Sequence, residues 1–296
     1  SSNPSDLVVW NGELWFLATT SSTARELWHS NGIAAPTVLD IAAGSATLNP
    51  QDLRAAGNQL FFTGQQSATG RELWRSNGTI AGTAIARDLA PGTTSSLVER
   101  ITPFGNRVLF WANDGTSGLE PWCSDGSVAG TVRLVDSVVG TGSSTAMNFA
   151  GQGAVAFFGA GSSGAFRIYR TDGTTANTTV AAGPFNLITE PVAAFGGVAF
   201  VGQLQSGQNL QLWRSDGTAA GTVDVPSPLT PYVNPSNLTA FGTRLLFGAT
   251  STNFGTEPYV SDGTANGTRI LADVASVRGD TPISEMLPFN GRLFFR

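Results

Sequence analysis

The sequence predicts an all-β fold that is built from repeated small antiparallel sheets. A short phrase, which runs from Arg71 to Thr79 in its clearest form, occurs six times along the chain. Glycine is abundant, with 36 residues, while charged residues make up only 12% of the sequence, as in turn-rich β proteins. No stretch shows a sustained helical period of apolar residues. Together these observations predict short strands joined by tight turns along the whole chain.

Each repeat begins with two short apolar runs that are separated by a turn containing Gly or Asn. In one clear copy the runs are 238–241 and 244–247, and the turn is Gly242-Thr243. Two such runs around a turn pair predict a β-hairpin. The repeated phrase then supplies a third strand, and the segment after it supplies a fourth. Four short antiparallel strands in a repeat of this length predict one blade of a β-propeller.

The end of the phrase predicts a tight turn between the third and fourth strands. Asp or Asn can bond to the backbone two residues on, and Gly accepts a positive φ, so Ser-Asp-Gly-Thr favours such a turn. A second Gly follows four residues after the first, and Asn177 replaces it in the fourth repeat. Because Gly and Asn share a tolerance for positive φ, we expect a left-handed backbone at this second position. It holds Gly82, Gly130, Gly221 and Gly267 in four other repeats.

The repeats predict a single propeller domain that covers residues 1–296. Asn3-Pro4-Ser5-Asp6-Leu7 matches 234–238, which lies at a junction between repeats, so the chain starts at a repeat boundary as if more repeats preceded it. Six full repeats and one further hairpin give 26 strands, which do not divide evenly into four-stranded blades, and seven blades are favoured over six. The repeats start near residues 7, 53, 101, 149, 192, 238 and 286, and the last is incomplete.

Charge and composition exclude several classes of partner. A net charge of −5 disfavours nucleic-acid binding, which requires clustered cations. No apolar run approaches the roughly 20 residues of a membrane-spanning helix. Cys123 is the only cysteine, which excludes an internal disulfide and a multi-cysteine metal site. We expect it to pack as a small apolar side chain.

The repeated phrase and the Gly-Thr that trails it resemble the bacterial family named for its ELWxxDGT (hyalin-like) repeat. The resemblance covers residues 7–296 and implies a large secreted or cell-surface protein, but no particular reaction. The fourth repeat departs from the phrase, with Arg167-Ile168-Tyr169 in its place. An acidic residue that follows later in the repeat is missing from the fourth and fifth copies. In the other four it is Asp40, Asp88, Asp136 and Asp273.

The repeated turns contain candidate calcium ligands. Hard cations bind carboxylate oxygens, and each turn offers one. Because a calcium site usually needs several convergent oxygens, a structural role in the turn is favoured, and no cofactor is expected. The candidate carboxylates are Asp125, Asp172, Asp216 and Asp262.

Two further positions of the phrase are predicted to be structural. An aromatic residue at the same place in every blade is best interpreted as a wedge between blades, although such rings can also stack on sugars. A glutamate two residues earlier lies on the same strand face, and when buried it needs donors such as backbone amides of an adjoining turn. The aromatic residues are Trp28, Trp74, Trp122, Tyr169, Trp213 and Tyr259. The glutamates are Glu26, Glu72, Glu120 and Glu257, with Arg167 and Gln211 in the other two repeats.

Few residues suit catalysis. His29 is the only histidine and lies at a variable position of the repeat, so a Ser-His-Asp triad would have to form around it. Paired carboxylates in a central channel would instead indicate a glycosidase. Asp114 and Asp280 break the repeat and are candidates for such a pair, but each is better interpreted as a solvated loop residue.

The sequence therefore predicts a secreted or cell-surface β-propeller that acts as a non-catalytic binding or scaffold module. A protein partner or self-assembly is expected, as part of a larger extracellular assembly. The main alternative is a lectin that binds cell-surface glycans with one site per blade. The third is a propeller glycosidase or lyase.

Overall fold

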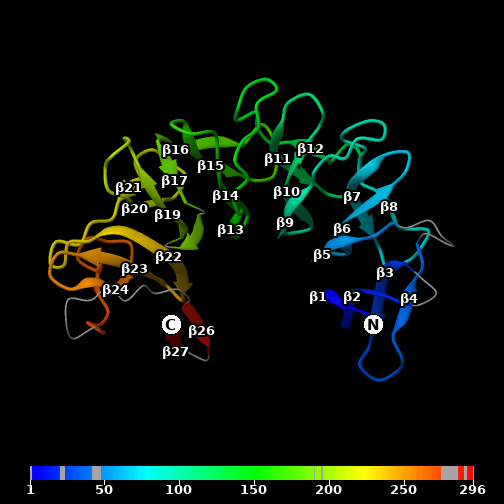
Figure 1. Ribbon diagram of the computed structural model, residues 1–296, viewed down its shortest axis with the longest axis horizontal. Coiled ribbons are helices and arrows are strands. Elements are labelled where there is room, and N and C mark those ends of the chain that lie inside the picture. Colours follow the sequence, from blue (N-terminus) through cyan, green and yellow to red (C-terminus); the bar gives the residue numbers. More distant parts are fainter. Residues whose placement is uncertain are drawn as a thin grey trace. The chain divides into compact units, whose positions relative to one another are not determined.

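All regular structure described in this chain is β-strand. The computed structural model describes residues 2–20, 24–41, 48–189, 191–194, 196–274, 286–289 and 292–295. Consecutive strands in these ranges pair antiparallel into small sheets, one for each repeat, which we call blades (Figure 1). The predicted all-β propeller fold is therefore confirmed. The described part of the chain contains no helix that is long and apolar enough to cross a membrane.

The chain comprises two compact units, which are treated separately. Unit 1 contains Ser1–Ala146 and Gly173–Asn177, and unit 2 contains Met147–Asp172 and Thr178–Arg296. The single domain, and the choice of seven blades over six, stay predictions.

Unit 1 contains the first three blades, and in each the strands lie side by side in chain order. Blade 1 consists of β1 (Ser5–Trp10), β2 (Glu13–Thr19), β3 (Arg25–Ser30) and β4 (Thr37–Leu39). Blade 2 consists of β5 (Gln51–Ala56), β6 (Gln59–Gln66), β7 (Gly70–Ser76) and β8 (Ala84–Ile85). Blade 3 consists of β9 (Glu99–Phe104), β10 (Arg107–Asn113), β11 (Leu119–Ser124) and β12 (Val132–Arg133).

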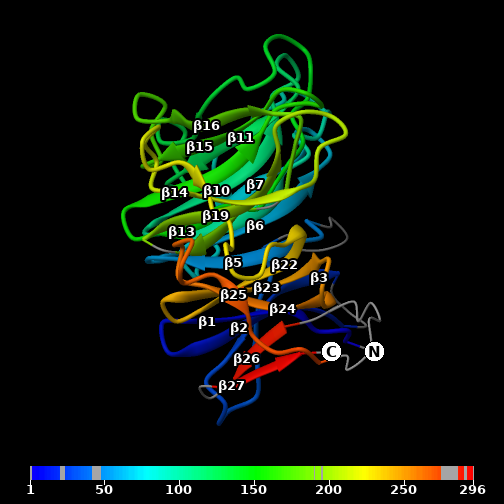
Figure 2. The same ribbon diagram turned by 90° about the vertical axis from the view of Figure 1, so that its left-hand side faces the viewer.

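Unit 2 contains three further blades and a terminal hairpin. Blade 4 consists of β13 (Ala150–Gln152), β14 (Val155–Ala160), β15 (Phe166–Thr171) and β16 (Thr179–Phe185). Blade 5 has its first strand in two pieces, β17 (Leu187–Ile188) and β18 (Val192–Ala194), followed by β19 (Gly197–Gln203), β20 (Gln211–Ser215) and β21 (Val223–Asp224). Blade 6 consists of β22 (Val233–Phe241), β23 (Arg244–Ser251), β24 (Gly255–Ser261) and β25 (Arg269–Ile270). The hairpin is formed by β26 (Met286–Phe289) and β27 (Arg292–Phe295), drawn in red in Figure 2.

The first strand of several blades begins with a bulge at an Asn-Pro motif. Asp6, Asp52 and Asn237 have φ of 52°, 57° and 53°, in the left-handed region that Asp and Asn tolerate better than most residues. The pairing register between the first and second strands shifts at these places, for example between Ser5 and Val8. The bulge interrupts the ladder and redirects the strand where it approaches the neighbouring blade.

The apolar core lies between consecutive blades within each unit. Leu27 of blade 1 and Phe62 of blade 2 belong to one buried cluster, while Phe110 of blade 3 packs into another with blade 2. In unit 2, Ile168 and Phe200 belong to the cluster between blades 4 and 5. Complete burial of such a side chain stabilises the fold by about 1.5–3 kcal/mol. Each blade therefore depends on its neighbour for stability, as in other repeat proteins.

The prolines in the third strands lie where the ladder to the outer strand ends. Pro121 belongs to β11, which pairs with β12 only at Trp122 and Cys123. The carbonyl oxygen of Pro121 still accepts a hydrogen bond from Leu134 N at 2.9 Å. A proline is tolerated here because no ladder hydrogen bond needs its missing N–H.

Candidate functional site

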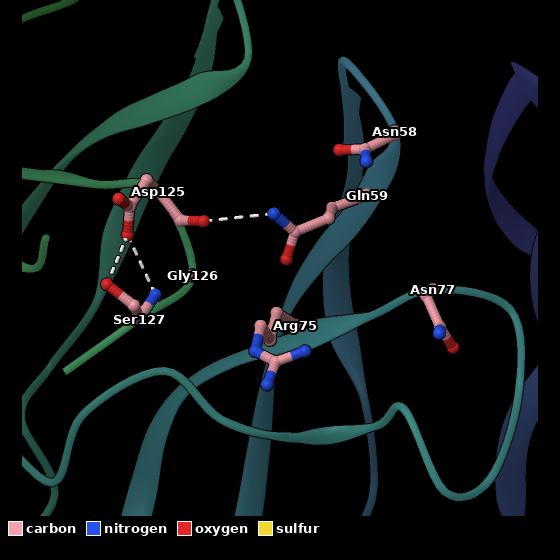
Figure 3. Close-up of a pocket in the computed structure, with 7 residues that line it drawn as sticks. All are labelled: Asn58, Gln59, Arg75, Asn77, Asp125, Gly126 and Ser127. Atoms are coloured by element: carbon pink, nitrogen blue, oxygen red, sulfur yellow. Dashed lines mark hydrogen bonds between the residues drawn. The ribbon is translucent and has the colours of Figure 1, made fainter.

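A polar pocket in unit 1 lies where the turn of blade 3 approaches blade 2. Its volume is about 300 Å³. Arg75 of β7 and Gln59 of β6 line one side, and the turn after β11 lines the other (Figure 3). Gln59 Nε2 donates to the Asp125 carbonyl oxygen at 2.9 Å and so links the two blades. The lining residues are Asn58, Gln59, Arg75, Asn77, Asp125, Gly126 and Ser127.

This pocket presents one cation and one anion. Arg75 Nη1 donates to the Gly82 carbonyl oxygen at 3.3 Å, and a guanidinium has five N–H donors in all. Asp125 Oδ1 accepts from Ser127 N at 2.8 Å and from Ser127 Oγ at 2.7 Å. Burial acts to raise the pKa of Asp125, but the hydrogen bonds from Ser127 outweigh it and the pKa lies below its usual value. Such a pair suits a ligand that both donates and accepts, as a peptide backbone does.

Sequence reasoning missed Arg75 and Gln59. A signal for the first was present, because the residue after the phrase aromatic is an arginine in three repeats. These are Arg75, Arg170 and Arg214.

The turn at Asp125 recurs in other blades with the same two bonds. Asp216 Oδ1 accepts from Thr218 N at 2.8 Å and Thr218 Oγ1 at 2.7 Å, and Asp262 bonds to Thr264 at 2.9 and 2.7 Å. These bonds lower the pKa of both aspartates. Asn77 makes the equivalent bonds through Oδ1 at 3.1 and 2.8 Å, so an amide oxygen serves the turn as well as a carboxylate does.

The left-handed backbone predicted for the second glycine of this turn is wrong. Neither the four glycines nor Asn177 has a positive φ. The glycine instead leaves space for the aspartate, because a Cβ on Gly130 would lie 2.1 Å from Asp125 Oδ1, so that the carboxylate would have to shift. A Cβ on Gly221 would lie equally close, 2.1 Å, to Asp216 Oδ1. The aspartate side chain fills the volume that a second side chain would need.

Both the favoured structural role of these turns and the alternative of calcium binding stay predictions. In Asp125, Asp216 and Asp262 the Oδ1 atom already accepts two hydrogen bonds from its own turn. Asp172 occupies the same position after β15 in blade 4. Among the residues that the structure describes, no three His, Cys, Asp or Glu side chains gather in one place. A calcium ion takes six to eight oxygen ligands, so most would have to come from outside the turn.

The phrase aromatics lie in or against the packing between blades. Four of them are buried, and Trp28 and Trp213 are half-buried. In blades 1 to 3 the indole Nε1 donates to a carbonyl oxygen of the second strand, as Trp74 does to Gly64 at 3.1 Å. Trp74 belongs to the cluster between blades 1 and 2, and Tyr259 to that between blades 5 and 6. A buried ring has no free face on which a sugar could stack. The buried four are Trp74, Trp122, Tyr169 and Tyr259.

The phrase glutamates are almost completely buried and bond to the segment after the fourth strand. Glu120 accepts from Ser137 N at 2.9 Å, Ser137 Oγ at 2.6 Å and Val138 N at 3.1 Å. One backbone amide bonds to each of the others: Ile41 N to Glu26 at 3.2 Å, Leu89 N to Glu72 at 3.2 Å and Val274 N to Glu257 at 2.9 Å. Each glutamate thereby joins its third strand to the end of its own blade.

A second carboxyl group lies near three of these glutamates. Burial raises the pKa of Glu26 and of Glu72 to about 7, and the nearby Asp40 and Asp88 add to this effect. Burial also raises the pKa of Glu120, beside Asp136. Sequence reasoning noted both positions but missed that they form a pair. The signal was their co-occurrence, because the fourth and fifth repeats lack both acids.

The remaining candidates for catalysis have structural contacts. His29 Nδ1 lies 2.8 Å from Glu13 Oε2, and its ring stacks on Trp15 at 4.6 Å. Cys123 is fully buried. Burial acts to raise the pKa of Asp114, but hydrogen bonds from the next loop residues outweigh it and lower the pKa to about 2. Asp280 lies outside the described residues.

Comparison with known proteins gives matches among solved structures only. No protein-family model matches the chain, and neither does any curated protein. A structure from a study of two prolyl endopeptidases is 11% identical and has a TM-score of 0.53, over 99% of this chain and 46% of that one. A puromycin-hydrolysing peptidase of Mycobacterium tuberculosis is 13% identical, with a TM-score of 0.47 over 93% of this chain and 54% of that one. The β-propeller domain of the Trilobed protease from Pyrococcus furiosus is 10% identical, with a TM-score of 0.46 over 91% and 84%.

These matches correct the predicted function. The chain spans about half the length of the two peptidases. At such low identity the likeness establishes the fold and no activity. The prediction of a non-catalytic binding or scaffold module is nevertheless contradicted, because the structure that the chain matches at a TM-score of 0.53 comes from a study of prolyl endopeptidases. The sequence reasoning rested on the scarcity of catalytic residues within this chain.

Proposed function

We propose that this chain is a propeller that works with a peptidase catalytic domain and controls which peptides reach it. The observation that carries the proposal is the match to the prolyl endopeptidase structure, which covers 99% of this chain but 46% of that protein. That structure comes from a study of the role of inter-domain dynamics in catalysis and specificity. The proposal extends this kind of role to the present chain.

The contacts of the scarce catalytic residue types support the assignment of catalysis to another domain. A hydrolytic nucleophile needs an adjacent base to activate it. The described contacts of His29 are with Glu13 and Trp15 and include no nucleophile, and Cys123 is buried in the third strand of its blade. The proposal therefore assigns peptide-bond cleavage to a separate catalytic domain. That this chain has no catalytic residues of its own remains a prediction.

The polar pocket between blades 2 and 3 suits peptide contact. It pairs the Arg75 guanidinium with the Asp125 turn, and both can bond to backbone amide groups. The extracellular location and the ELWxxDGT-family membership suggested by the repeated phrase stay predictions.

A capture experiment tests the proposed function. The purified chain, and the native material captured from its source with an antibody to this chain, are each incubated with a short and a long fluorogenic peptide. We expect the purified chain to leave both peptides intact. The captured material should cleave the short peptide faster than the long one and should react with a fluorophosphonate active-site probe.

Two results would overturn the proposal. One is captured material with no more peptidase activity than a capture with an unrelated antibody. The other is cleavage by the purified chain itself, which would place the catalytic residues within it.

A further inference from the structure

A second pocket lies between blades 5 and 6 of unit 2. Its volume is about 480 Å³, in the range of small-ligand sites. Val201 and Pro235 in its lining are buried, whereas Asn234 and Asn237 are exposed, so an apolar floor opens to solvent through a polar rim. Leu210, which stands at the first position of the phrase in blade 5, is also part of the lining.

In blade 1 an arginine side chain occupies the place that corresponds to this pocket. Arg25 stands at the first position of the phrase there, and its Nε donates to the Pro50 carbonyl oxygen of blade 2 at 3.0 Å. Its Nη2 donates to Ser5 Oγ and lies 3.5 Å from Asp6 Oδ2. The arginine thus bridges the first strand of its own blade and the first strand of the next.

Blade 2 has an arginine at the same position, but its guanidinium bonds to residues of its own blade and not to blade 3. Arg71 Nη1 donates to the Asn49 carbonyl oxygen at 3.0 Å and to Thr63 Oγ1 at 3.2 Å. Two consecutive blades therefore use a guanidinium here.

The strand registers show that the pocket is the same place in blade 5. Leu27 of the phrase pairs with Leu17, and Leu17 pairs with Ser5. In blade 5, Leu212 of the phrase pairs with Val201, whose carbonyl oxygen accepts from Thr189 N at 2.8 Å. Thr189 therefore corresponds to Ser5.

The neighbouring blade also corresponds. Asn49-Pro50 and Asn234-Pro235 open the same bulged motif, so the Pro235 carbonyl oxygen corresponds to the acceptor of the Arg25 bond. The blade 5 pocket thus keeps a backbone carbonyl and the Thr189 hydroxyl as acceptors, and Leu210 is apolar and cannot donate to them. Thr189 Oγ1 accepts from Val201 N at 3.1 Å, which leaves its second lone pair for a ligand.

We propose that this pocket between blades 5 and 6 binds the arginine side chain of a peptide, which takes the place that Arg25 and Arg71 take in blades 1 and 2. The apolar floor covers the aliphatic stem, and the guanidinium donates to Thr189 Oγ1 and to the Pro235 carbonyl oxygen. This inference goes beyond the proposed function and does not depend on a peptidase partner.

The chemistry favours arginine over the other side chains that could enter. A leucine side chain would cover the floor but leave the acceptors without donors. A lysine ammonium is a compact, strongly hydrated charge, whereas the planar guanidinium can bond to two separated acceptors at once. No charged residue is among the described lining residues, so we expect modest affinity.

Binding is tested with N-acetyl-arginine amide as the probe, titrated into the purified chain and followed by calorimetry. The lysine and leucine amides serve as comparison ligands. We expect the arginine amide to bind at least roughly fivefold more tightly than either of them, a difference of about 1 kcal/mol.

Substitutions locate the site. Leu210→Arg should fill the pocket from within and weaken arginine-amide binding at least tenfold. Leu119→Arg adds the same charge at the same phrase position of blade 3 and should leave binding unchanged. Val201→Thr recreates the hydroxyl that Thr63 provides to Arg71, and it should tighten binding about threefold.

Several outcomes would overturn the inference. They are leucine-amide binding as tight as that of the arginine amide, absence of arginine-amide binding, and unchanged binding in Leu210→Arg. If Leu210→Arg does not fold, Val201→Thr decides the matter, because unchanged or weaker binding in that variant places the guanidinium elsewhere.

Discussion

Two carboxylates of the same phrase, Glu120 and Asp125, have opposite surroundings. Glu120 is fully buried and accepts hydrogen bonds from residues 17 and 18 positions further along the chain. Asp125 is exposed and accepts hydrogen bonds from Ser127, only two positions away. Burial raises the pKa of Glu120, whereas local hydrogen bonds outweigh burial at Asp125 and lower its pKa.

The difference separates two functions of the repeated phrase. The glutamate holds the third strand to the end of the blade and therefore belongs to the tertiary structure. The aspartate holds only its own turn, which other blades build with asparagine. Residue type alone does not distinguish these roles, because both positions carry an acid.

Removal of the buried glutamate should have the largest effect. Glu120→Ala leaves the half-buried amides of Ser137 and Val138 without an acceptor, which should cost roughly 3 kcal/mol of unfolding free energy. Thermal unfolding, followed by circular dichroism, measures this loss of stability. Glu120→Gln, which keeps one acceptor oxygen, should lose less than half as much. Equal losses for the two variants would show that the carboxyl group acts by volume alone.

Stability should also depend on pH in a direction set by the buried glutamates. Burial raises the folded-state pKa of Glu26 and Glu72 to about 7, above the ordinary value of 4.5, so the fold favours their neutral forms. Their contribution is fully present below pH 4.5 and is lost as the pH rises through about 7. We expect the melting temperature to fall by roughly 2–8 °C between about pH 5 and pH 8.

A matched pair of variants tests the source of that slope. One is the parent chain, and the other carries Glu26→Gln and Glu72→Gln. In the variant with both glutamates replaced, the melting temperature should fall less steeply as the pH rises. The turn aspartates have lowered pKa values, so their contribution is lost only as the pH falls below the ordinary value of 3.8. An unchanged slope would mean that the glutamates do not titrate in this range.

Periodicity predicted most of the fold because each blade repeats the same local chemistry. Alternating apolar runs and Gly turns were sufficient to place four strands in every blade. The split first strand of blade 5 was not predictable, since the repeat pattern contains no counterpart of the bonds that Thr189 makes to Val201 through both its backbone and its side chain.

The pockets were harder to predict because they arise where blades meet. Nothing in the sequence marks Leu210 as part of a binding site. Its role becomes visible only when the strand registers align it with Arg25. Gln59 likewise gains its role only through contact with a turn 66 residues away. Sequence periodicity shows what each blade contains, whereas such sites depend on what two blades bring together.

The second glycine of the turn should show an intermediate effect. In Gly130→Ala the new Cβ would displace the Asp125 side chain from its bonds to Ser127, and we expect a loss of about 1–2 kcal/mol. Thermal unfolding measures this loss. Gly151→Ala is the control, because its Cβ would meet nothing within 4 Å. In an Asp125→Ala background the Gly130→Ala penalty should shrink, and an undiminished penalty would place the clash elsewhere.

Substitution of an exposed turn aspartate should have the smallest effect on stability, in contrast to substitution of the buried glutamate. Asp216→Asn keeps the Oδ1 acceptor for Thr218, as Asn77 does for Thr79, and should leave the melting temperature within about 1 °C of the parent. Asp216→Ala removes both bonds at an exposed site and should cost less than about 1 kcal/mol. Thermal unfolding of both variants provides the test. If Asp216→Asn proved as damaging as Glu120→Ala, the carboxylate charge would matter at the turn, and a bound cation would become its best explanation.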